Sequence, residues 1–213
     1  MKKIGNVFIL GDSYSTFEGY IPEGYSPFYT KTAEYTDVND VKDTWWHRLL
    51  SQTESNLVRN SSWSGTTICH TGYEGLDRCE ISFTGRLDKL INDGFFEENK
   101  IDTFFFLGGT NDSWAESPIG EMMLSGWTKE DLYSVLPAIG YIFRRMADEL
   151  QSKGVRIVCI LNNELKDVIT DALRDACIRH NFDFVELRDI DKLEGHPTIL
   201  GMEQIKNQVL EIL

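Results

Sequence analysis

Four residues far apart in the chain could together carry out acyl transfer. Ser13, in a Gly-Asp-Ser motif, offers a hydroxyl nucleophile, and His196, in front of a proline, offers a base that takes the hydroxyl proton. Asn111, within Gly-Gly-Thr-Asn-Asp, offers an amide donor, while Gly65 lets the backbone approach closely and offer its own N–H. With the N–H of Ser13, these donors would form a three-donor oxyanion hole. The set of residue types therefore predicts a serine nucleophile acting on an acyl group.

Sequence segments that are typical of buried strands precede these four residues and would position them. Several of these runs are continuously apolar, which suits strands covered on both faces of a parallel sheet. Active sites in such sheets lie beyond the carboxyl ends of the strands. We therefore expect Ser13, Gly65, Asn111 and His196 to meet at one edge. The five predicted strands are 6–11, 55–60, 102–107, 156–161 and 182–187.

Helical patterns with three-four apolar spacing alternate with these strands. They cover 132–150, 165–176 and 202–212, and Pro137 either kinks the first of them or marks its true start. Alternating strands and helices predict an α/β fold with right-handed crossovers and helices on both faces of the sheet. The chain contains no internal repeat or Pro/Gly-rich linker, so we expect one domain over residues 1–213.

One segment, about 14–46, is too long to be a simple crossover beside the first strand. It contains 9 of the chain's 25 aromatic residues, including Trp45 and Trp46. This aromatic content favours an ordered insert, because long loops in a domain are usually functional or disordered. We expect the two tryptophans to begin the first helix and pack on the sheet. Whether the tyrosines of the insert pack inside or line a substrate cleft stays open.

Net charge and residue spacing exclude several classes of binding partner and cofactor. The formal net charge of -13 argues against nucleic acid or an anionic membrane as the main partner. No apolar run reaches the ~18 residues that cross a bilayer, and the first strand shows no leader-like cleavage site. This points to a cytoplasmic protein, or to a secreted one if a leader was removed. The four cysteines and four histidines lack the short spacings of metal sites, so we expect no metal and no cofactor.

The order of the motifs carries a family resemblance. Ser13, Gly65, Asn111 and His196, each in its characteristic surroundings, resemble the SGNH hydrolases, also called GDSL-type esterases and lipases. The resemblance runs from residue 11 to residue 196. It implies a flavodoxin-like three-layer α/β/α sandwich with a five-stranded parallel sheet, and ester hydrolysis without metal or organic cofactor. It also implies that Ser13 is the nucleophile, that His196 is the base, and that Ser13, Gly65 and Asn111 form the oxyanion hole.

The triad acid departs from the family pattern. The family usually places an aspartate three residues before the histidine, and this chain has Leu193 there. We predict that Asp191 takes the role, through a slightly longer loop. Asp189 and Glu194 are alternatives, and so is a Ser-His dyad oriented by a backbone carbonyl, because the acid serves to fix the tautomer and orientation of the ring.

The predicted substrate is a small ester, which Tyr14 and Trp114 would contact beside the nucleophile. The tyrosine-rich surroundings favour a short acyl group on a carbohydrate. Two non-catalytic hypotheses compete with an esterase. One is a flavodoxin-like module whose hydroxyl-rich loop at 13–16 binds a phosphate or flavin, and the other is a carbohydrate-binding relative that has lost its acid. The sequence does not indicate an oligomeric state.

Overall fold

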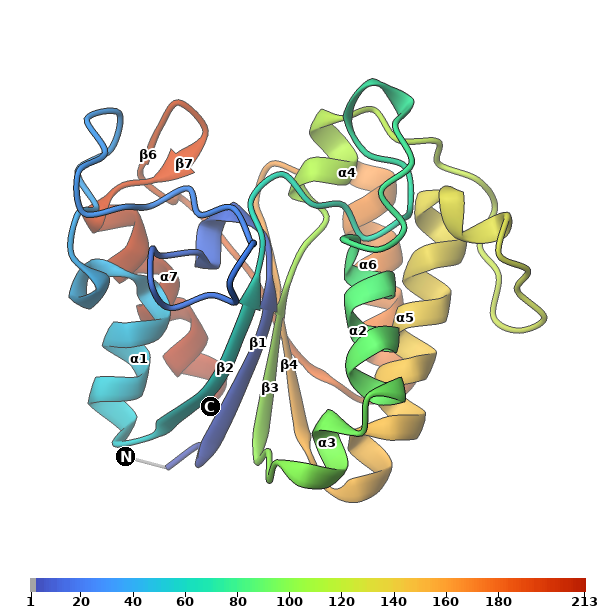
Figure 1. The fold of residues 1–213 in the computed structure, drawn as a ribbon, viewed down its shortest axis with the longest axis horizontal. Helices are drawn as coiled ribbons and strands as arrows, with labels where there is room; N and C mark the ends of the chain where they lie inside the picture. Colours follow the sequence, from blue (N-terminus) through green and yellow to red (C-terminus); the bar gives the residue numbers. More distant parts are fainter. Residues whose placement is uncertain (1–2) are drawn as a thin grey trace.

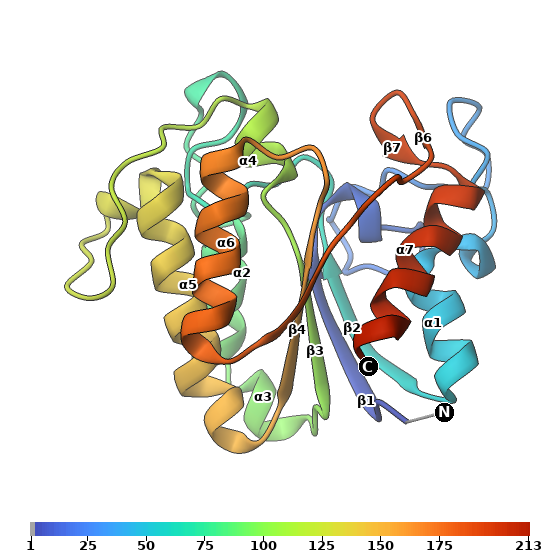
Figure 2. The ribbon, with the colours of Figure 1, turned by 180° about the vertical axis from the view of Figure 1, so that it is seen from behind.

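The computed structural model describes residues 3–213, and a five-stranded sheet lies between two layers of helices (Figures 1 and 2). The order of the strands is β2-β1-β3-β4-β5, and every neighbouring pair is parallel. The predicted α/β/α sandwich is therefore confirmed, with strand ends no more than two residues from those predicted. The strands are β1 Asn6–Gly11, β2 Asn56–Ser62, β3 Thr103–Leu107, β4 Arg156–Leu161 and β5 Asp183–Glu186.

The helices cover the two faces of the sheet unequally. Figure 1 shows α1 and α7 on one face and α2, α5 and α6 on the other, with the short α3 and α4 at opposite ends of the second layer. A two-stranded hairpin, β6 Lys192–Leu193 with β7 His196–Pro197, lies at the carboxyl edge of the sheet. The helices are α1 Trp45–Thr53, α2 Phe83–Asn92, α3 Phe95–Glu98, α4 Thr110–Trp114, α5 Val135–Glu149, α6 Asp167–His180 and α7 Ile199–Ile212.

Strand β1 shows how the sequence produces two cores. Its alternate residues point to opposite faces of the sheet. Val7 and Ile9 pack in the core beneath α1 and α7, while Phe8 and Leu10 pack in the core beneath α2, α5 and α6. All four are fully buried, and each such side chain contributes about 1.5–3 kcal/mol by its removal from water. The residues just beyond the strand are therefore held on a rigid support.

Pro137 marks the beginning of a helix and does not kink it. Helix α5 begins at Val135, after Ser134 at the N-cap, so the proline lies in the first turn. The N–H groups of a first turn have no partner within the helix, and a proline there costs nothing. The predicted apolar pattern began slightly earlier because Leu132 belongs to a separate turn, η4 Asp131–Tyr133.

The aromatic insert is folded against the α1 and α7 face. Apart from the 3-10 turns η1 Ser13–Ser15 and η2 Val41–Asp43, residues 16–44 form loops and turns. Phe17, Tyr29, Trp45 and Trp46 are buried in the same core as α1 and α7. Helix α1 does begin at Trp45, as expected. The insert therefore adds to the core at the edge where the candidate site lies.

The remaining short turns are η3 Tyr73–Gly75 and η5 Gln151–Lys153. None of the helices within residues 3–213 has the length and apolarity that crossing a membrane would require.

Candidate active site

Ser13 lies immediately beyond β1, in a short 3-10 turn. The strand ends at Gly11, Asp12 caps the 3-10 turn η1, and the crossover helix begins only at Trp45. The carboxylate of Asp12 accepts the N–H of Tyr14 at 3.1 Å. Ser13 is therefore at the start of a single turn and not of a long helix, and its position depends on that cap and on close packing. Ser13 is 3% exposed.

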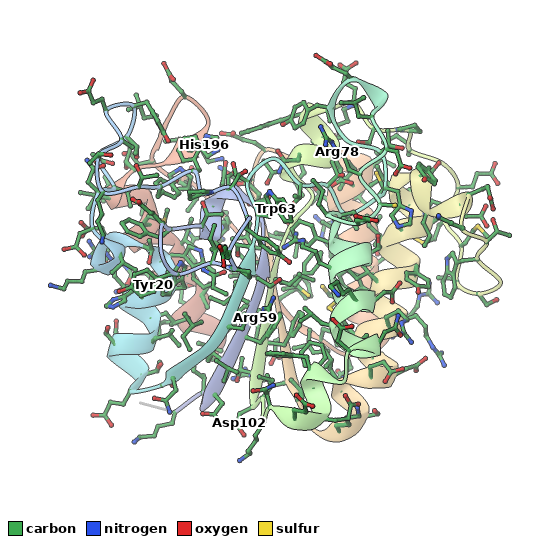
Figure 3. All side chains as sticks on the ribbon, viewed as in Figure 1. Tyr20, Arg59, Trp63, Arg78, Asp102 and His196 are labelled. Atoms are coloured by element: carbon green, nitrogen blue, oxygen red, sulfur yellow. The ribbon has the colours of Figure 1, made fainter. Side chains whose placement is uncertain are left out.

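His196 is presented by a tight hairpin beyond β5. Leu193 pairs with His196 across β6 and β7, and the two residues between them, Glu194 and Gly195, have φ angles of 49° and 80°. A two-residue turn with both φ angles positive matches the twist of a hairpin, and glycine adopts this backbone conformation without strain. The hairpin places the imidazole at the carboxyl edge of the sheet, where Figure 3 labels it.

Ser13 and His196 meet as expected. The distance from Ser13 Oγ to His196 Nε2 is 3.0 Å, although the residues lie 183 positions apart. Burial lowers the pKa of His196 below its ordinary value of 6.5, and the positive charge of Lys192 lowers it further. The ring is therefore neutral near pH 7. With its proton on Nδ1, the ring has a lone pair on Nε2 that accepts from the Ser13 hydroxyl.

The structure corrects the prediction that Asp191 orients this ring. The carboxylate of Asp191 accepts a hydrogen bond from the hydroxyl of Thr198, at the start of α7. His196 Nδ1 instead lies 3.4 Å from the backbone carbonyl of Glu194. Among residues 3–213, no carboxylate of Asp191, Asp189 or Glu194 lies within hydrogen-bonding distance of the ring. The geometry is that of a Ser-His dyad oriented by a backbone carbonyl, because the short hairpin turns its carbonyl toward Nδ1.

Aromatic residues from the insert hold the histidine in place of a carboxylate. The ring of Phe28 stacks on His196, with 3.6 Å between centroids and 7° between planes. The hydroxyl of Tyr14 donates to the carbonyl of Gly195 at 2.5 Å, and that of Tyr29 donates to the carbonyl of Pro197 at 2.9 Å. The residues before and after the histidine are thus fixed from the insert. Sequence analysis identified the aromatic insert but missed this role.

The prediction that Tyr14 contacts substrate is wrong. Tyr14 is fully buried, so its ring offers no surface to a ligand. Its hydroxyl accepts from the amide of Asn162 at 3.3 Å while it donates to Gly195. Burial raises the pKa of Tyr14 far above its ordinary value, so the hydroxyl keeps its proton and remains a donor. Tyr14 therefore supports the hairpin that carries His196.

Lys192 fixes the other strand of the hairpin. Its side chain is 7% exposed and forms an ion pair with Glu164 at 2.9 Å. The same ammonium donates to the side-chain oxygens of Asn162 at 3.2 Å and Asn163 at 2.8 Å. These partners lie in the loop after β4. The hairpin is therefore attached to the sheet edge on both sides.

Asn111 lies at the first turn of α4, where its amide is held by two contacts. Its Nδ2 donates to the carbonyl of Thr66 at 2.9 Å, and its Oδ1 accepts from the hydroxyl of Tyr73 at 2.9 Å. An amide nitrogen carries two N–H groups, so one remains for a substrate oxygen. Asn111 is 3% exposed. Tyr73 was not singled out in the sequence, since nothing in its neighbours marks it.

Gly65 lies on the same loop as Thr66, directly after β2. Its φ angle of 76° is in the left-handed region, and a Cβ placed on it would meet no atom within 4 Å. A side chain is thus disfavoured by backbone conformation and not by crowding. The loop is held from below by Arg86, which is 2% exposed and donates to the carbonyls of Gly11 and Ser61 and to the hydroxyl of Thr66. Arg86 therefore ties the ends of β1 and β2 to the loop.

Two buried carboxylates complete this side of the site. Asp112 accepts the N–H groups of Ile68 and Cys69 at 2.8–3.2 Å, which fixes the loop after Gly65. Burial raises the pKa of Asp112 to about 6 and that of Asp12 to about 7. These groups have no contact with the His196 ring, so they act as structural acceptors.

Trp114 lies beside the histidine at the end of α4. Its ring centroid is 5.7 Å from that of His196, and the planes meet at 71°. The side chain is 37% exposed, which leaves part of the ring accessible. Its predicted contact with substrate fits this position and stays a prediction. Within residues 3–213, no three His, Cys, Asp or Glu side chains gather as a metal site would require.

The comparisons with known proteins agree with this geometry. A family model for GDSL-like lipases and acylhydrolases matches residues 5–213. The chain is similar to a putative GDSL-like lipase from Bacteroides ovatus, with 43% identity and a TM-score of 0.90 over 99% of this chain and 98% of that one. A putative GDSL-like lipase from Bacteroides uniformis is 40% identical, with a TM-score of 0.88 over 97% and 94% of the two chains. No curated protein matches the sequence.

A more distant likeness concerns the fold alone. A family two carbohydrate esterase from Clostridium thermocellum, solved in complex with cellohexaose, has 16% identity and a TM-score of 0.61. The match covers all of this chain and 64% of that one. The family match over nearly the whole chain, together with the identity to the two Bacteroides structures, shows that this chain belongs to the GDSL-like lipase/acylhydrolase family, whose members are hydrolases of the esterase type.

Proposed function

We propose that this protein is a serine esterase that works through an acyl-enzyme and removes a short acyl group from a carbohydrate. The observation that carries the proposal is the 3.0 Å contact between Ser13 Oγ and the neutral imidazole of His196. A hydroxyl in contact with a neutral base can lose its proton as it attacks a carbonyl carbon. Family membership supports the same class of reaction.

The proposed chemistry has two halves. Ser13 Oγ attacks the ester carbonyl, Nε2 of His196 takes the hydroxyl proton, and the proton passes to the departing alcohol as the ester bond breaks. Water then attacks the acyl-enzyme, gives a proton to Nε2, and the proton returns to Ser13 as the carboxylic acid leaves. The remaining N–H of Asn111 and the N–H groups of Gly65 and Ser13 are the proposed donors to the carbonyl oxygen in both halves.

A carbohydrate ester suits the surroundings better than a long acyl chain. The surface beside His196 contains the partly exposed ring of Trp114, and Tyr73 presents a hydroxyl next to Asn111. Such amphipathic rings can contact the faces of sugars. The fold likeness to a carbohydrate esterase that binds cellohexaose supports this choice.

The nucleophile is the direct test. Ser13→Ala should lower turnover of 4-nitrophenyl acetate by several orders of magnitude, because the attacking oxygen is gone. A fluorophosphonate probe should label the parent protein at Ser13 and leave Ser13→Ala unlabelled. Full activity in the alanine variant would end the proposal, provided that circular dichroism shows the variant folded.

A non-catalytic carbohydrate-binding protein is the second candidate. It is favoured by one observation, the absence of a carboxylate on the His196 ring within residues 3–213. The same probe separates the two candidates, since only an activated serine reacts readily. A parent protein that is not labelled but binds oligosaccharides would support the binding function.

A further inference from the structure

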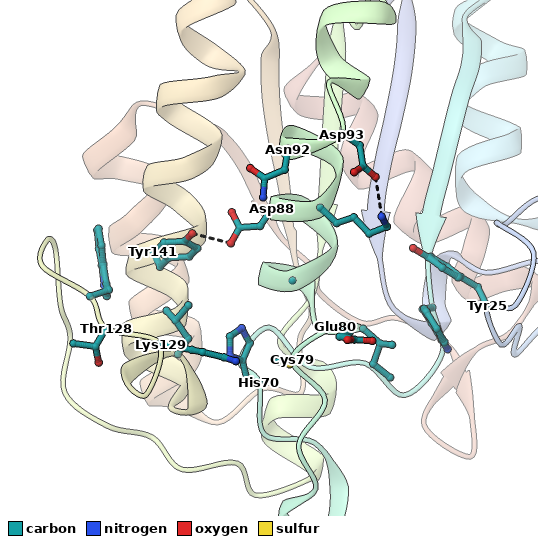
Figure 4. A pocket seen from close by; sticks show the side chains of 16 residues that line it. Tyr25, His70, Cys79, Glu80, Asp88, Asn92, Asp93, Thr128, Lys129 and Tyr141 are labelled. Carbon is teal, nitrogen blue, oxygen red and sulfur yellow. Dashed lines mark hydrogen bonds and ion pairs between the residues drawn. The ribbon is translucent and has the colours of Figure 1, made fainter.

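A cavity distinct from the Ser13 and His196 pair crosses the exposed face of α2. Its volume is about 930 Å³, and neither Ser13 nor His196 lines it. The volume is within the ~300–1,000 Å³ of small-molecule sites. Figure 4 shows the helix as its floor, with Tyr25 on one side and Thr128 and Tyr141 on the other. We call this cavity the α2 groove.

Pairs of aromatic rings form the two walls of the α2 groove. Tyr25, from the insert, stacks on Trp63 with 4.1 Å between centroids and 26° between planes. On the other wall, Trp127 meets Tyr141 edge to face at 5.6 Å and 82°. All four rings are partly exposed and line the cavity. The groove therefore offers flat apolar surfaces on both sides of a polar helix face.

The floor of the α2 groove presents fixed polar groups. Asp88 and Asn92 are four residues apart on α2 and share one face of the helix. The carboxylate of Asp88 is held by the hydroxyl of Tyr141 at 2.7 Å and by Nε of Arg145 at 3.0 Å. A polar group whose position is fixed loses little conformational freedom when it binds a ligand.

Two buried nitrogens along the α2 groove have no partner. They are Nε1 of Trp127 and Nδ1 of His70, and neither forms a hydrogen bond within the part of the chain that the structure describes. His70 is 6% exposed, and burial lowers its pKa, so its ring is neutral. A buried polar atom left without a hydrogen bond costs about 1–3 kcal/mol. The groove therefore lacks one acceptor for the indole N–H and one partner for the imidazole.

We propose that the α2 groove binds a neutral oligosaccharide. A sugar hydroxyl both donates and accepts hydrogen bonds. After small adjustments of the two rings, hydroxyls of one ligand could therefore bond to the indole N–H of Trp127 and to Nδ1 of His70. The C–H faces of sugar rings pack on flat aromatic surfaces, which the two walls supply. The lining of the groove includes three carboxylates, on Glu80, Asp88 and Asp93, and two lysines, of which Lys89 is paired with Asp93. This charge balance does not favour a polyanion.

The α2 groove is connected to the candidate active site through the loop after β2. Trp63 precedes Gly65 by two residues, and its N–H donates to the carbonyl of Gly11 at 3.2 Å. A chain of sugars in the groove would have one end near the proposed oxyanion hole. The inference thus deepens the proposed function by assigning the groove to the glycan that carries the ester, and it rests on that function only for this last step.

The first experiment measures binding without turnover. Ser13→Ala is titrated with hexasaccharides of glucan, xylan, mannan and chitin, and intrinsic tryptophan fluorescence is followed. At least one should bind at millimolar concentration or below. Adding Trp127→Ala or Tyr25→Ala should weaken it about fivefold to tenfold, since an aromatic contact contributes about 1 kcal/mol. Trp127→Phe keeps a ring but loses the N–H, so its affinity should lie between those of the parent and Trp127→Ala. Tyr20→Ala changes an exposed tyrosine outside the groove, so its affinity should equal that of the parent.

The second experiment separates the groove from catalysis. In the protein with Ser13 intact, Trp127→Ala should raise KM for an acetylated form of the bound oligosaccharide several-fold and leave kcat/KM for 4-nitrophenyl acetate unchanged. No binding by any of the four oligosaccharides, or unaltered binding in Trp127→Ala, Trp127→Phe and Tyr25→Ala, would overturn the groove assignment. If the parent shows no hydrolysis but the binding losses occur, the proposed esterase fails while the groove assignment stands.

Discussion

The two sides of the candidate active site are held in different ways. On the Asn111 side, buried charged groups from α2 and α4 fix the loops that carry the proposed donors: Arg86 donates to backbone carbonyls at the ends of β1 and β2, and Asp112 accepts N–H groups of the loop after β2. On the His196 side, Tyr14 and Tyr29 reach the hairpin from about 170–180 residues away in the chain. The first side is fixed by charged groups of α2 and α4, whereas the second is fixed by hydroxyls of the insert and by the ion pair of Lys192 with Glu164.

The difference shows how the ring of His196, the proposed base, can be oriented without an acid. A triad aspartate fixes the tautomer and the direction of the ring. Here the carbonyl of Glu194 faces Nδ1, Phe28 stacks on the ring, and the tyrosine hydroxyls fix the hairpin. The ring is oriented in this way, but within residues 3–213 no carboxylate contacts it to stabilise an imidazolium. We therefore expect changes on the two sides to affect activity differently.

The largest effect in this comparison is expected on the oxyanion side. Asn111→Ala should lower kcat on 4-nitrophenyl acetate about a hundredfold or more, because one oxyanion donor is worth about 3 kcal/mol. Tyr73→Phe keeps the ring but removes the hydroxyl that fixes the amide, and it should cost about tenfold or less. Steady-state kinetics of both variants measure this. If both variants lost the same factor in kcat, or if neither lost any, Asn111 would not act as the donor.

On the histidine side, Tyr14→Phe should lower kcat about tenfold and change KM little. The substitution leaves the carbonyl of Gly195 without its donor, which costs about 1–3 kcal/mol and loosens the hairpin. Tyr133→Phe is the matched control, because its hydroxyl contacts Asp77 on the exposed surface. A Tyr14→Phe enzyme with parental kcat would show that Phe28 and Tyr29 suffice to hold the ring.

The charge of Lys192 should appear in the pH profile. The base acts when neutral, so activity falls as the pH drops through the pKa of His196, which lies below 6.5. Lys192 contributes to that lowered pKa, and Lys192→Met should therefore shift the acid limb of kcat/KM to higher pH. Lys153→Met, on an exposed lysine of the η5 turn, should leave the limb in place. A shift to lower pH would contradict the electrostatic argument.

The smallest effect is expected at the position first predicted as the triad acid. Asp191→Asn should change kcat/KM by no more than about twofold, as for an exposed residue away from the chemistry. Its carboxylate bonds to Thr198 and not to His196. A loss of several hundredfold would mean that Asp191 reaches the ring during catalysis. The His196 side of the site would then be oriented by an acid as well as by the insert.

Much of this protein could be predicted from sequence because its signals are local. Strand β1 reads as a continuous apolar run that stops at Gly11, and the Gly-Asp-Ser motif follows directly. Parallel strands bring their carboxyl ends together, so the placement of Ser13 and Asn111 beyond the ends of the neighbouring strands β1 and β3 followed from topology. The role of Tyr14 did not, because a tyrosine beside a nucleophile fits a substrate wall as well as a buried support. Burial decided between them.

The sequence by itself determined the order of strands and helices along the chain, and its motifs predicted a nucleophile, a base, an amide donor and the class of reaction that they suggest. Tertiary structure decided which group faces His196 Nδ1, what the aromatic insert supports, and where the α2 groove opens. The physical reason is the separation along the chain of the residues that make each contact. Periodicity and motif spacing record contacts within a few residues, whereas the hydrogen bond from Tyr14 to Gly195 spans 181 residues and exists only once the two loops are packed together.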